Sequence, residues 1–406
     1  MVLAVTTHPS VSILSLHYPP EPTGNAPYTG SLAAELAARG VRVVAHVGQP
    51  HYPEWKFRPG YEQWSRVENV EGVEVHRRRH YVPRPPRGVR RLLSELSFGL
   101  RLLFARIRAE DRVVVVTPAL FAAAVVLLRL KLRPTRRVFV WVQDIYTLGL
   151  AETGQGGGAI GSVTRRVERW VMRRADTVVV IHERFAKYVT ESLSVEGSRV
   201  AVIRNWTHLP AAPSVSRDEA RVALGWPRDQ RLVVHTGNMG SKQGLANVID
   251  AAKKAEQGGL RLKFMLVGDG AERQALEVRA EGCSAIEFVD PLSAELYPLA
   301  LAAADILLVN EKPGVAEMAV PSKLTSYFNS GRPVVAATDL GGITASEIHA
   351  AGAGMVIAAG DPAALVAAVW SMTDAEGAAF GESGLRFREN QLDVVRAVDR
   401  WLQLLS

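Results

Sequence analysis

Short apolar runs alternate with amphipathic or polar segments along the first half of the chain. The runs are rich in Val, Ile and Leu and lie at residues 12–16, 41–47, 113–117, 138–142, 177–181 and 200–203. Each is bounded by Gly, Pro or polar residues, which is typical of strands buried on both faces of a parallel sheet. The segment Ser31–Gly40 has a helical composition and ends in Gly40, a natural C-terminal capping residue. The alternation therefore predicts an α/β fold built from βαβ units.

The same alternation begins again after Arg204–Ala220, a polar and proline-rich segment that we interpret as a domain boundary. Further predicted strands lie at residues 231–237, 261–270, 285–290, 304–310, 332–338 and 354–359. We predict two Rossmann-like, doubly wound parallel-sheet domains that face each other across a cleft. Their predicted bounds are residues 1–208 and 209–388, and residues 389–406 form a helix that could cross back to the N-terminal domain.

Composition narrows the class of protein. The chain has 406 residues, of which 48% are hydrophobic and 22% charged, a balance that is ordinary for soluble domains with large cores. The single cysteine, Cys283, excludes an intramolecular disulfide and a cysteine metal site, and it fits a reducing cytosol. We expect no secretory signal, because no charged region precedes an apolar run at the N-terminus. The longest apolar stretch, Val113–Leu128, is interrupted by Thr117 and Pro118, so we interpret it as a strand and a packed helix.

Positive charge is concentrated in one segment. The net charge is +7, and Arg77–Arg108 alone contains ten arginines and one acid, Glu95. Such a segment requires an anionic partner, which could be lipid head groups, a pyrophosphate substrate or nucleic acid. Nucleic acid is disfavoured, because the segment has no recognised binding module and no platform of stacking aromatics.

Within the basic segment, residues 89–108 have helical periodicity. Five apolar side chains share one predicted face: Leu92, Leu96, Leu100, Leu103 and Ile107. Two interpretations stay open: an amphipathic helix in an anionic membrane interface, or a domain helix whose apolar face lies in the core. The candidate contacts for an acceptor or a membrane are Tyr28, Arg90, Arg91 and Arg101.

Polar residues follow the predicted strands of the first half. The loop His17–Gly30 comes after the first strand, and Gly24 in it permits a close backbone approach to a ligand, although a plain turn would look the same. The loop is no GxGxxG fingerprint, so an NAD site is poorly supported. Asp144 follows the strand 138–142, where a carboxylate could bind or deprotonate a hydroxyl group or simply cap a helix. His182 follows another strand and could equally be structural.

Two segments of the second half could bind a diphosphate. Residues 235–245 contain three glycines together with Asn238 and Lys242, and Val267–Gly270 is a second glycine-rich turn. In residues 320–335, Ser322 could cap a helix that places Lys323 in its first turn. A cation is unfavourable there unless a phosphate lies nearby, although an exposed lysine would cost little. Glu317, just upstream, could bind sugar hydroxyls or lie on a solvated loop.

At these residues the sequence resembles the family-4 retaining glycosyltransferases of the GT-B fold, in the colanic-acid and exopolysaccharide branch with its fucosyl- and N-acetylfucosaminyltransferase-like enzymes. The resemblance covers nearly the whole chain and is carried by YPPEPTGNAPYTG, QPHYPEW, YVPRPP with SELSF, VQD, GNMGSKQGL, VGDG and PSKLTSYFNSGRPVV. It implies transfer from a UDP- or GDP-sugar with retention and without a metal or other cofactor. It also places the acceptor in the N-terminal domain and the donor in the C-terminal domain.

The resemblance and the local patterns together define a candidate site. The predicted catalytic residues are Asp144, Lys242 and Lys323. The predicted donor-binding residues are Gly24, Gly237, Asn238, Gly240, Gly268, Glu317, Pro321, Ser322 and Ser326. The sequence departs from the broader family at Asn238, where an arginine is usual, and at Ser326, where a glutamate is usual. Gln243 stands at the usual spacing of the phosphate-binding lysine, so the lysine register could shift by one residue.

The implied mechanism needs no protein nucleophile. Lys242, Lys323 and backbone amides would stabilise the leaving diphosphate, while Asp144 guides the acceptor hydroxyl. A glycan or a polyprenyl-diphosphate-linked glycan is the expected acceptor, because such a lipid would explain the basic segment. We therefore expect a cytoplasmic protein that is peripheral on the inner face of the cell membrane and acts in polysaccharide synthesis. The alternatives are a sugar-nucleotide epimerase of the same fold and a non-catalytic nucleotide-sugar-binding subunit, which the missing arginine and glutamate would favour.

Overall fold

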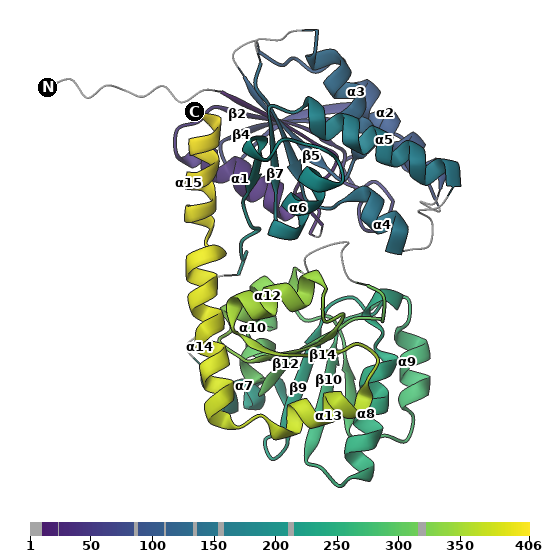
Figure 1. The fold of residues 1–406 in the computed structure, drawn as a ribbon, viewed down its shortest axis with the longest axis vertical. Helices are drawn as coiled ribbons and strands as arrows, with labels where there is room; N and C mark the ends of the chain where they lie inside the picture. The colour runs from purple at the N-terminus through teal and green to yellow at the C-terminus, as the bar shows by residue number, and fades with distance from the viewer. Residues whose placement is uncertain are drawn as a thin grey trace, which may run out of the picture. The chain divides into compact units, whose positions relative to one another are not determined.

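The chain forms two compact units (Figure 1). The computed structural model describes residues 10–22, 24–84, 88–108, 111–132, 136–152, 158–209, 215–315 and 322–406. The N-terminal unit consists of the residues up to Asn205 together with Val394–Ser406, and the C-terminal unit is Trp206–Asp393. The predicted boundaries after residues 208 and 388 lie near these divisions.

The N-terminal unit contains an eight-stranded sheet in the order β3-β4-β2-β1-β5-β6-β7-β8. Its strands are β1 Val11–Ser15, β2 Val43–Gly48, β3 Ser65–Val70, β4 Val73–Arg78, β5 Arg112–Thr117, β6 Val138–Val142, β7 Thr177–Val180 and β8 Val200–Val202. All neighbouring strands are parallel except β3 and β4. The predicted strands of the first half are confirmed, and in all of them except the edge strand β8 the branched apolar residues are mostly buried.

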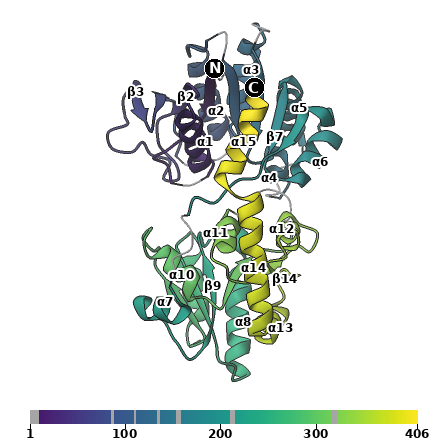
Figure 2. The same cartoon turned by 90° about the vertical axis from the view of Figure 1, so that its left-hand side faces the viewer.

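Helices from both ends of the sequence cover this sheet. They are α1 Ala26–Ala38, α2 Val89–Leu102, α3 Leu120–Leu130, α4 Tyr146–Glu152, α5 Gly158–Arg174, α6 Glu183–Glu191, the 3₁₀ turn η1 Gly197–Arg199 and the C-terminal helix α15 Val394–Leu405. Helix α15 runs alongside α1 (Figure 2). Its Trp401 packs edge-on against Trp141 of β6, with the ring centroids 5.2 Å apart. Arg112 of β5 donates to the carbonyl oxygens of Leu405 and Ser406, so the last turn of α15 is fixed to this unit.

The antiparallel hairpin β3–β4 differs from the other strands in that no apolar run at residues 65–78 predicts it. Glu71 and Gly72 form its turn with φ angles of 51° and 79°, the conformation of a two-residue hairpin loop. β3 is an edge strand whose Val67 is 61% exposed, so it lacks the apolar run that marks the buried strands.

Helix α2 corrects the predicted helix 89–108 in two respects. It ends at Leu102, and its buried face consists of Ser94, Glu95, Phe98, Gly99 and Leu102 rather than the predicted leucine stripe. The reason is a close contact with α3, because a Cβ atom on Gly99 would lie 2.9 Å from Ala122 Cα. Leu100 of the predicted stripe is 55% exposed.

The C-terminal unit is a six-stranded, fully parallel sheet in the order β11-β10-β9-β12-β13-β14. Its strands are β9 Arg231–Thr236, β10 Leu262–Val267, β11 Ile286–Val289, β12 Ile306–Asn310, β13 Val334–Thr338 and β14 Gly354–Ala358. Its helices are α7 Arg217–Leu224, the 3₁₀ turn η2 Ser241–Gln243, α8 Ala246–Gln257, α9 Arg273–Ala280, α10 Tyr297–Ala303, α11 Lys323–Asn329, α12 Ile343–Ala351, α13 Pro362–Ser371 and α14 Asp374–Gln391. Successive strand residues enter separate apolar clusters, one on each face of the sheet. The predicted pair of doubly wound sheets is confirmed.

Each sheet contains a point at which the strand order reverses. It lies between β1 and β5 in the N-terminal unit and between β9 and β12 in the C-terminal unit. In doubly wound folds the crevice for a ligand opens at this point, at the carboxyl ends of the strands. Among the described residues, no helix is long and apolar enough to cross a membrane.

Candidate active site

A cavity of about 160 Å³ lies at the reversal point of the N-terminal sheet. Residues that follow β1, β2, β5 and β6 meet there with side chains of α2. The lining consists of Leu16, His17, Gly24, Asn25, Tyr52, Trp55, Arg91, Ser94, Glu95, Pro118, Ala119 and Asp144. Asn25 donates to the carbonyl oxygen of Thr117 and so ties the loop after β1 to the end of β5. Gly24 has a φ of 69°, which favours glycine at this position.

Two carboxyl groups lie in the wall of this cavity, which we call the N-terminal pocket. Asp144 is half-buried just after β6, and Glu95 is buried on α2. Glu95 Oε2 accepts from the backbone N–H of Phe121, 3.1 Å away, and burial raises the pKa of Glu95 to about 7. Arg91 Nε lies 3.9 Å from Glu95 Oε1. The structure thus brings Gly24, Arg91 and Asp144 together as predicted candidates, and it adds Glu95, whose only sequence signal was its place as the single acid among ten arginines.

Aromatic side chains form another part of the N-terminal pocket. Trp55 lies edge-on to Tyr52 and to His51, with ring centroids 6.3 Å and 5.5 Å apart. Trp55 has a φ of 51°, an unfavourable conformation for a bulky residue that the surrounding packing must hold. Strain of this kind often occurs at ligand sites. The motif QPHYPEW contains these aromatic residues, but no local pattern in it predicts their role.

Beneath the pocket, Glu21 holds the segment after β2. Glu21 Oε1 accepts from the backbone N–H groups of His51 and Tyr52, and Glu21 Oε2 lies 2.7 Å from His17 Nδ1. His17, Glu21 and His51 are close enough together to be considered as metal ligands. His51 Nδ1 is 2.9 Å from the carbonyl oxygen of Gln49, so this nitrogen carries a proton and donates, and only Nε2 of His51 could bind a metal. The backbone hydrogen bonds to Glu21 hold the segment after β2 in either case.

Buried histidines make the stability of the N-terminal unit sensitive to acid. Burial lowers the pKa of His46 to about 3 and of His51 to about 4. Between pH 7 and pH 5 the unfolded chain takes up protons at these residues while the folded chain does not, so stability falls with pH by about 2 kcal/mol for each. The raised pKa of Glu95 acts in the opposite direction, because only the folded chain takes up that proton. The contribution of Glu95 is also about 2 kcal/mol, so we expect a net loss of roughly 2 kcal/mol from these three groups, measured by urea unfolding.

The Glu95→Gln variant is the control for this measurement. It removes the opposing proton uptake, so its stability should fall more steeply between pH 7 and pH 5 than that of the wild type. Equal stability at the two pH values in both proteins would contradict the assignment of the buried histidines.

In the C-terminal unit, two glycine turns touch at the ends of β9 and β10. Gly237 and Gly268 have φ angles of 119° and 138°, and a Cβ atom on Gly268 would lie 2.0 Å from the carbonyl oxygen of Gly237. A side chain is therefore excluded at Gly268. Gly240 packs against Asn238, whose exposed side chain begins the following turn. All four are predicted donor-binding residues, and the structure places them together.

The next turn, η2, is held against the end of β12. Asn310 donates to the carbonyl oxygens of Gln243 and Gly244, and the backbone N–H of Lys312 donates to the carbonyl oxygen of Lys242. Lys242 is half-buried on this turn. The reversal point between β9 and β12 thus has a rigid backbone with a lysine next to it.

Lys323 brings a second cation to the same place from α11. Its Nζ lies 3.2 Å from Gln243 Oε1 and 3.4 Å from His235 Nε2, and a Cβ atom on Gly237 would be 3.7 Å from it. Burial lowers the pKa of Lys323 to about 7. Gln243 stands at the spacing expected for a phosphate-binding lysine, and here Lys323 contacts that glutamine. The structure thereby brings an amine to that point from another element.

The remaining donor candidates are placed as follows. Ser322 occupies the N-cap position of α11, but its side chain makes no capping hydrogen bond, contrary to the expected role. Ser326 is hydrogen-bonded to Tyr297, which also lies 3.1 Å from the hydroxyl of Thr236 at the end of β9. Glu317 and Pro321 lie outside the described residues.

The residues predicted to contact an acceptor or a membrane lie at different places in the N-terminal unit. Tyr28 is buried on α1 and does not line the N-terminal pocket. Arg90 is exposed and donates to the carbonyl oxygen of Arg84. Arg101 lies over the ring of Trp64 at 4.0 Å and donates to Ser65, so the β3 edge engages it. His182 caps α6 by accepting a hydrogen bond from the backbone N–H of Arg184, so it has the structural role that the sequence left open.

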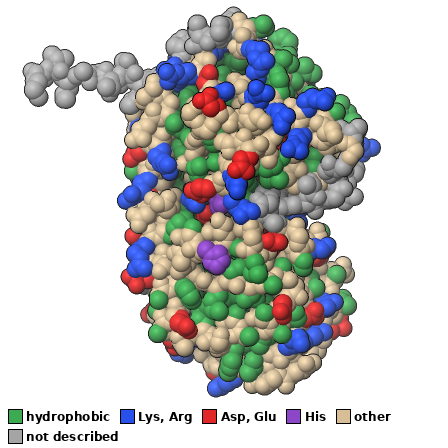
Figure 3. All heavy atoms as spheres, viewed as in Figure 1, with side chains coloured by type: hydrophobic (Ala, Val, Ile, Leu, Met, Phe, Trp, Pro, Cys, Tyr) green, Lys and Arg blue, Asp and Glu red, His purple; other side chains and the backbone are tan. Residues whose placement is uncertain are grey.

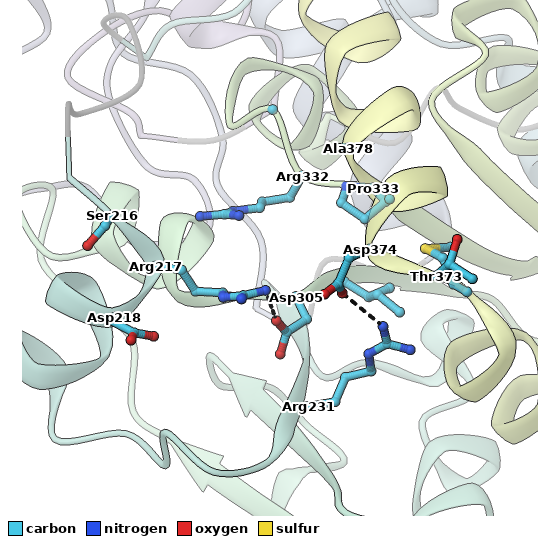
Figure 4. A pocket seen from close by; sticks show the side chains of 14 residues that line it. Ser216, Arg217, Asp218, Arg231, Asp305, Arg332, Pro333, Thr373, Asp374 and Ala378 are labelled. Carbon is cyan, nitrogen blue, oxygen red and sulfur yellow. Dashed lines mark hydrogen bonds and ion pairs between the residues drawn. The ribbon is translucent and has the colours of Figure 1, made fainter.

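A larger cavity, of about 470 Å³, lies elsewhere in the C-terminal unit (Figure 4). Arg231, Ile306 and Pro333 place it at the amino ends of β9, β12 and β13, the opposite edge of the sheet from the glycine turns. Arg217 pairs with Asp305 and Arg231 with Asp374 in its wall. Because the lining arginines and aspartates are equal in number, this cavity shows no excess charge for a diphosphate.

Comparison with known proteins agrees with this arrangement. The family model described as Glycosyl transferase 4-like domain matches residues 23–206, and the model described as Glycosyl transferases group 1 matches residues 230–374. The chain is 31% identical over 348 residues to a protein of Escherichia coli (strain K12) named as the colanic acid biosynthesis glycosyl transferase WcaI, covering 82% of this chain and 84% of that protein.

Solved structures share the fold. HepE of Anabaena, in complex with UDP, superposes with a TM-score of 0.73 at 16% identity, covering 98% of this chain and 99% of that one. Sucrose-phosphate synthase of Thermosynechococcus elongatus superposes with a TM-score of 0.75 at 16% identity, covering 98% of each chain. Both likenesses extend over the two units and identify the GT-B fold. The chain belongs to the glycosyltransferase family, with a glycosyl transferase 4-like domain in its N-terminal unit and a group 1 domain in its C-terminal unit.

Proposed function

We propose that this glycosyltransferase moves a sugar from a UDP- or GDP-sugar, with retention and without a metal, to a glycan or polyprenyl-diphosphate-linked glycan in cell-surface polysaccharide synthesis. The name of the Escherichia coli relative supports the polysaccharide role, and the UDP complex of HepE supports the donor class. The observation that carries the proposal is the convergence of Lys323 on the glycine turn at Gly237.

The donor end would work by charge stabilisation. Negative charge develops on the diphosphate as the bond to the sugar breaks, and cations in a water-poor site stabilise that charge most strongly. Lys323 and Lys242 would supply the positive charge, and the backbone at Gly237, which has no side chain next to the Lys323 amine, leaves room for phosphate oxygens to approach. No protein nucleophile is needed if the acceptor hydroxyl attacks from the face that the diphosphate leaves.

The N-terminal pocket has the chemistry expected of an acceptor site. Aromatic rings such as Trp55 offer an apolar face to a sugar ring, while Asp144 and Glu95 can accept hydrogen bonds from its hydroxyl groups. Asp144 is our candidate for orienting the reacting hydroxyl. Arg91, half-exposed at the rim, could bind a phosphate of a lipid-linked acceptor.

An exposed apolar surface on α2 and α3 supports a peripheral position on an anionic membrane at the cytoplasmic face. We call it the α2–α3 surface, and its large apolar residues are Val89, Leu93, Leu100, Phe104, Leu128 and Leu132. Val89, Leu93 and Leu100 share one face of α2, and exposed Arg90, Arg106 and Lys131 lie in the same segments. Hydrophobic and basic side chains occur together where Figure 1 labels these helices (Figure 3).

Replacing Leu100 and Phe104 with aspartate should weaken binding to phosphatidylglycerol vesicles by roughly tenfold or more, because each apolar side chain gains up to about 2 kcal/mol on burial. Flotation of the protein with vesicles measures the bound fraction. The control is Val278→Asp, an equally exposed position on α9. If both variants bind as the wild type does, the α2–α3 surface is not a membrane contact.

Donor binding tests the proposed function directly. Calorimetric titration with UDP, GDP, dTDP and NAD should show selective binding of one diphosphate, and the matching nucleotide sugars are then screened for transfer to a lipid-linked glycan. Conversion of the nucleotide sugar without an acceptor would instead indicate an epimerase. Binding without turnover on any acceptor would favour a non-catalytic subunit.

A further inference from the structure

Lys323 is a half-buried cation whose observed hydrogen-bond partners are neutral. Its amine contacts Gln243 Oε1 at 3.2 Å and His235 Nε2 at 3.4 Å. His235 is fully buried, and its Nδ1 lies 3.2 Å from the carbonyl oxygen of Leu308. Because a carbonyl can only accept, Nδ1 carries the proton and Nε2 is left with a lone pair. The amine therefore donates to both neighbours, and an ammonium group has one further N–H to offer.

The titratable groups that interact with Lys323 are His235 on β9 and Glu311 just after β12. Lys242 on η2 and Tyr327 on α11 lie in the adjoining elements. Burial lowers the pKa of His235 and raises that of Tyr327, so both are neutral near pH 7. Glu311 attracts Lys323, but its oxygens accept from the hydroxyl groups of Thr338 and Thr344.

Within the described part of the chain, no carboxylate forms an ion pair with Lys323. Burial consequently dominates over the attraction of Glu311 and lowers the pKa of Lys323 to about 7. A lysine in such a place is charged in only part of the molecules near neutral pH.

We infer that His235 and Gln243 hold the Lys323 amine for the donor diphosphate, and that Lys323 takes up a proton when the diphosphate binds. This inference rests on the proposed function. A bound diphosphate supplies the missing anion next to the amine and so favours its charged form. His235 acts through Lys323 and is therefore a positioning residue.

Calorimetry in buffers of different ionisation enthalpy measures how many protons the protein takes up when the diphosphate binds. At pH 8, titration with UDP and GDP should show uptake of about 0.9 proton by the protein for the diphosphate that binds, since a group with a pKa of about 7 is then mainly neutral. In Lys323→Arg the guanidinium is always charged, so binding should proceed without proton uptake. The matched control Lys254→Arg, at an exposed position of α8, should keep the uptake.

The pH dependence of affinity is a second measurement. Between pH 7.5 and pH 9 the diphosphate affinity of the wild type should fall roughly 20-fold, because the binding-competent protonated fraction shrinks by that factor. The affinity of Lys323→Arg should stay nearly constant over this range.

The positioning role of His235 is tested by diphosphate affinity and by proton uptake, in addition to folding and activity. In His235→Leu the amine loses one acceptor and is free to reach water, so affinity should fall and proton uptake at pH 8 should shrink. His235→Gln keeps an oxygen acceptor and should restore part of both. If His235 were merely structural, the proton count would not change in the folded variant.

The outcomes separate the inference from the function on which it rests. Binding of a diphosphate by the wild type with the same enthalpy in every buffer would overturn the inference and leave the proposed function standing. Proton uptake that persists in Lys323→Arg would also overturn it. If no diphosphate binds to the folded wild type, the proposed function itself fails.

Discussion

Replacing Lys323 with alanine is expected to weaken binding of the donor diphosphate about 100- to 1,000-fold, the largest functional effect that we predict. Lys323 is half-buried beside Gly237, where the surrounding protein limits the screening of its charge by water, so its contribution to binding an anion is large. The loss should appear in calorimetric affinity for the diphosphate and, to at least the same extent, in kcat/KM for sugar transfer.

Lys254→Ala is the control for this substitution, because Lys254 is an exposed lysine of the same unit. Lys323→Ala should unfold at the urea concentration of the wild type or higher, since alanine removes a partly desolvated charge from the interior. Unchanged diphosphate affinity in a folded Lys323→Ala variant would remove Lys323 from the donor site.

Asp305→Ala should lower the free energy of unfolding of the C-terminal unit by about 3–5 kcal/mol, the largest effect on stability. Asp305 forms ion pairs with Arg217 and Arg221 and accepts the backbone N–H of Leu232 at 2.7 Å. The side chain of Arg221 is only 3% exposed, so the substitution leaves a buried guanidinium without its carboxylate. Urea unfolding of the wild type and the variant measures the difference.

The matched control is Asp218→Ala. Asp218 pairs with Arg228 on the surface of the same unit, and the side chains of both residues are at least 60% exposed. Exposed pairs contribute little, so this variant should lose less than about 1 kcal/mol. Equal stability of the two variants would mean that the buried ion pairs of Asp305 do not hold β9 and α7 together.

The parts of the fold that could be predicted from sequence are those in which burial sets the residue type. Runs such as 138–142 are apolar because helices cover both faces of their strand, and that pattern is visible without a structure. The hairpin at Glu71 and Gly72 is not predicted from the sequence, because the hydrophobic pattern of an edge strand alternates weakly and includes charged residues. The buried face of α2 is not predicted for a different reason. Gly99 determines this face by its close packing against Ala122, and the spacing of leucines along the helix does not indicate that contact.

The residues of the candidate site likewise include some that the sequence predicts and some that it does not. Glycines, Asp144 and Lys323 stand out because their residue type and position after a strand have a chemical meaning. Glu95 and His235 depend on contacts made between distant segments, Glu95 with the start of α3 and His235 with α11. Only folding brings these partners within hydrogen-bond distance, so local patterns do not predict their roles.

Helix α15 has a consequence for the order in which the protein is made. The N-terminal unit includes α15, and Trp401 covers Trp141 in its interior. A ribosome must therefore translate all of β9 to α14 before the chain can complete the first sheet's packing. During synthesis the C-terminal unit is therefore fully translated before the N-terminal unit. Until α15 is made, Trp141 lacks its contact with Trp401. Nascent N-terminal units would then expose an apolar surface to chaperones until translation reaches α15.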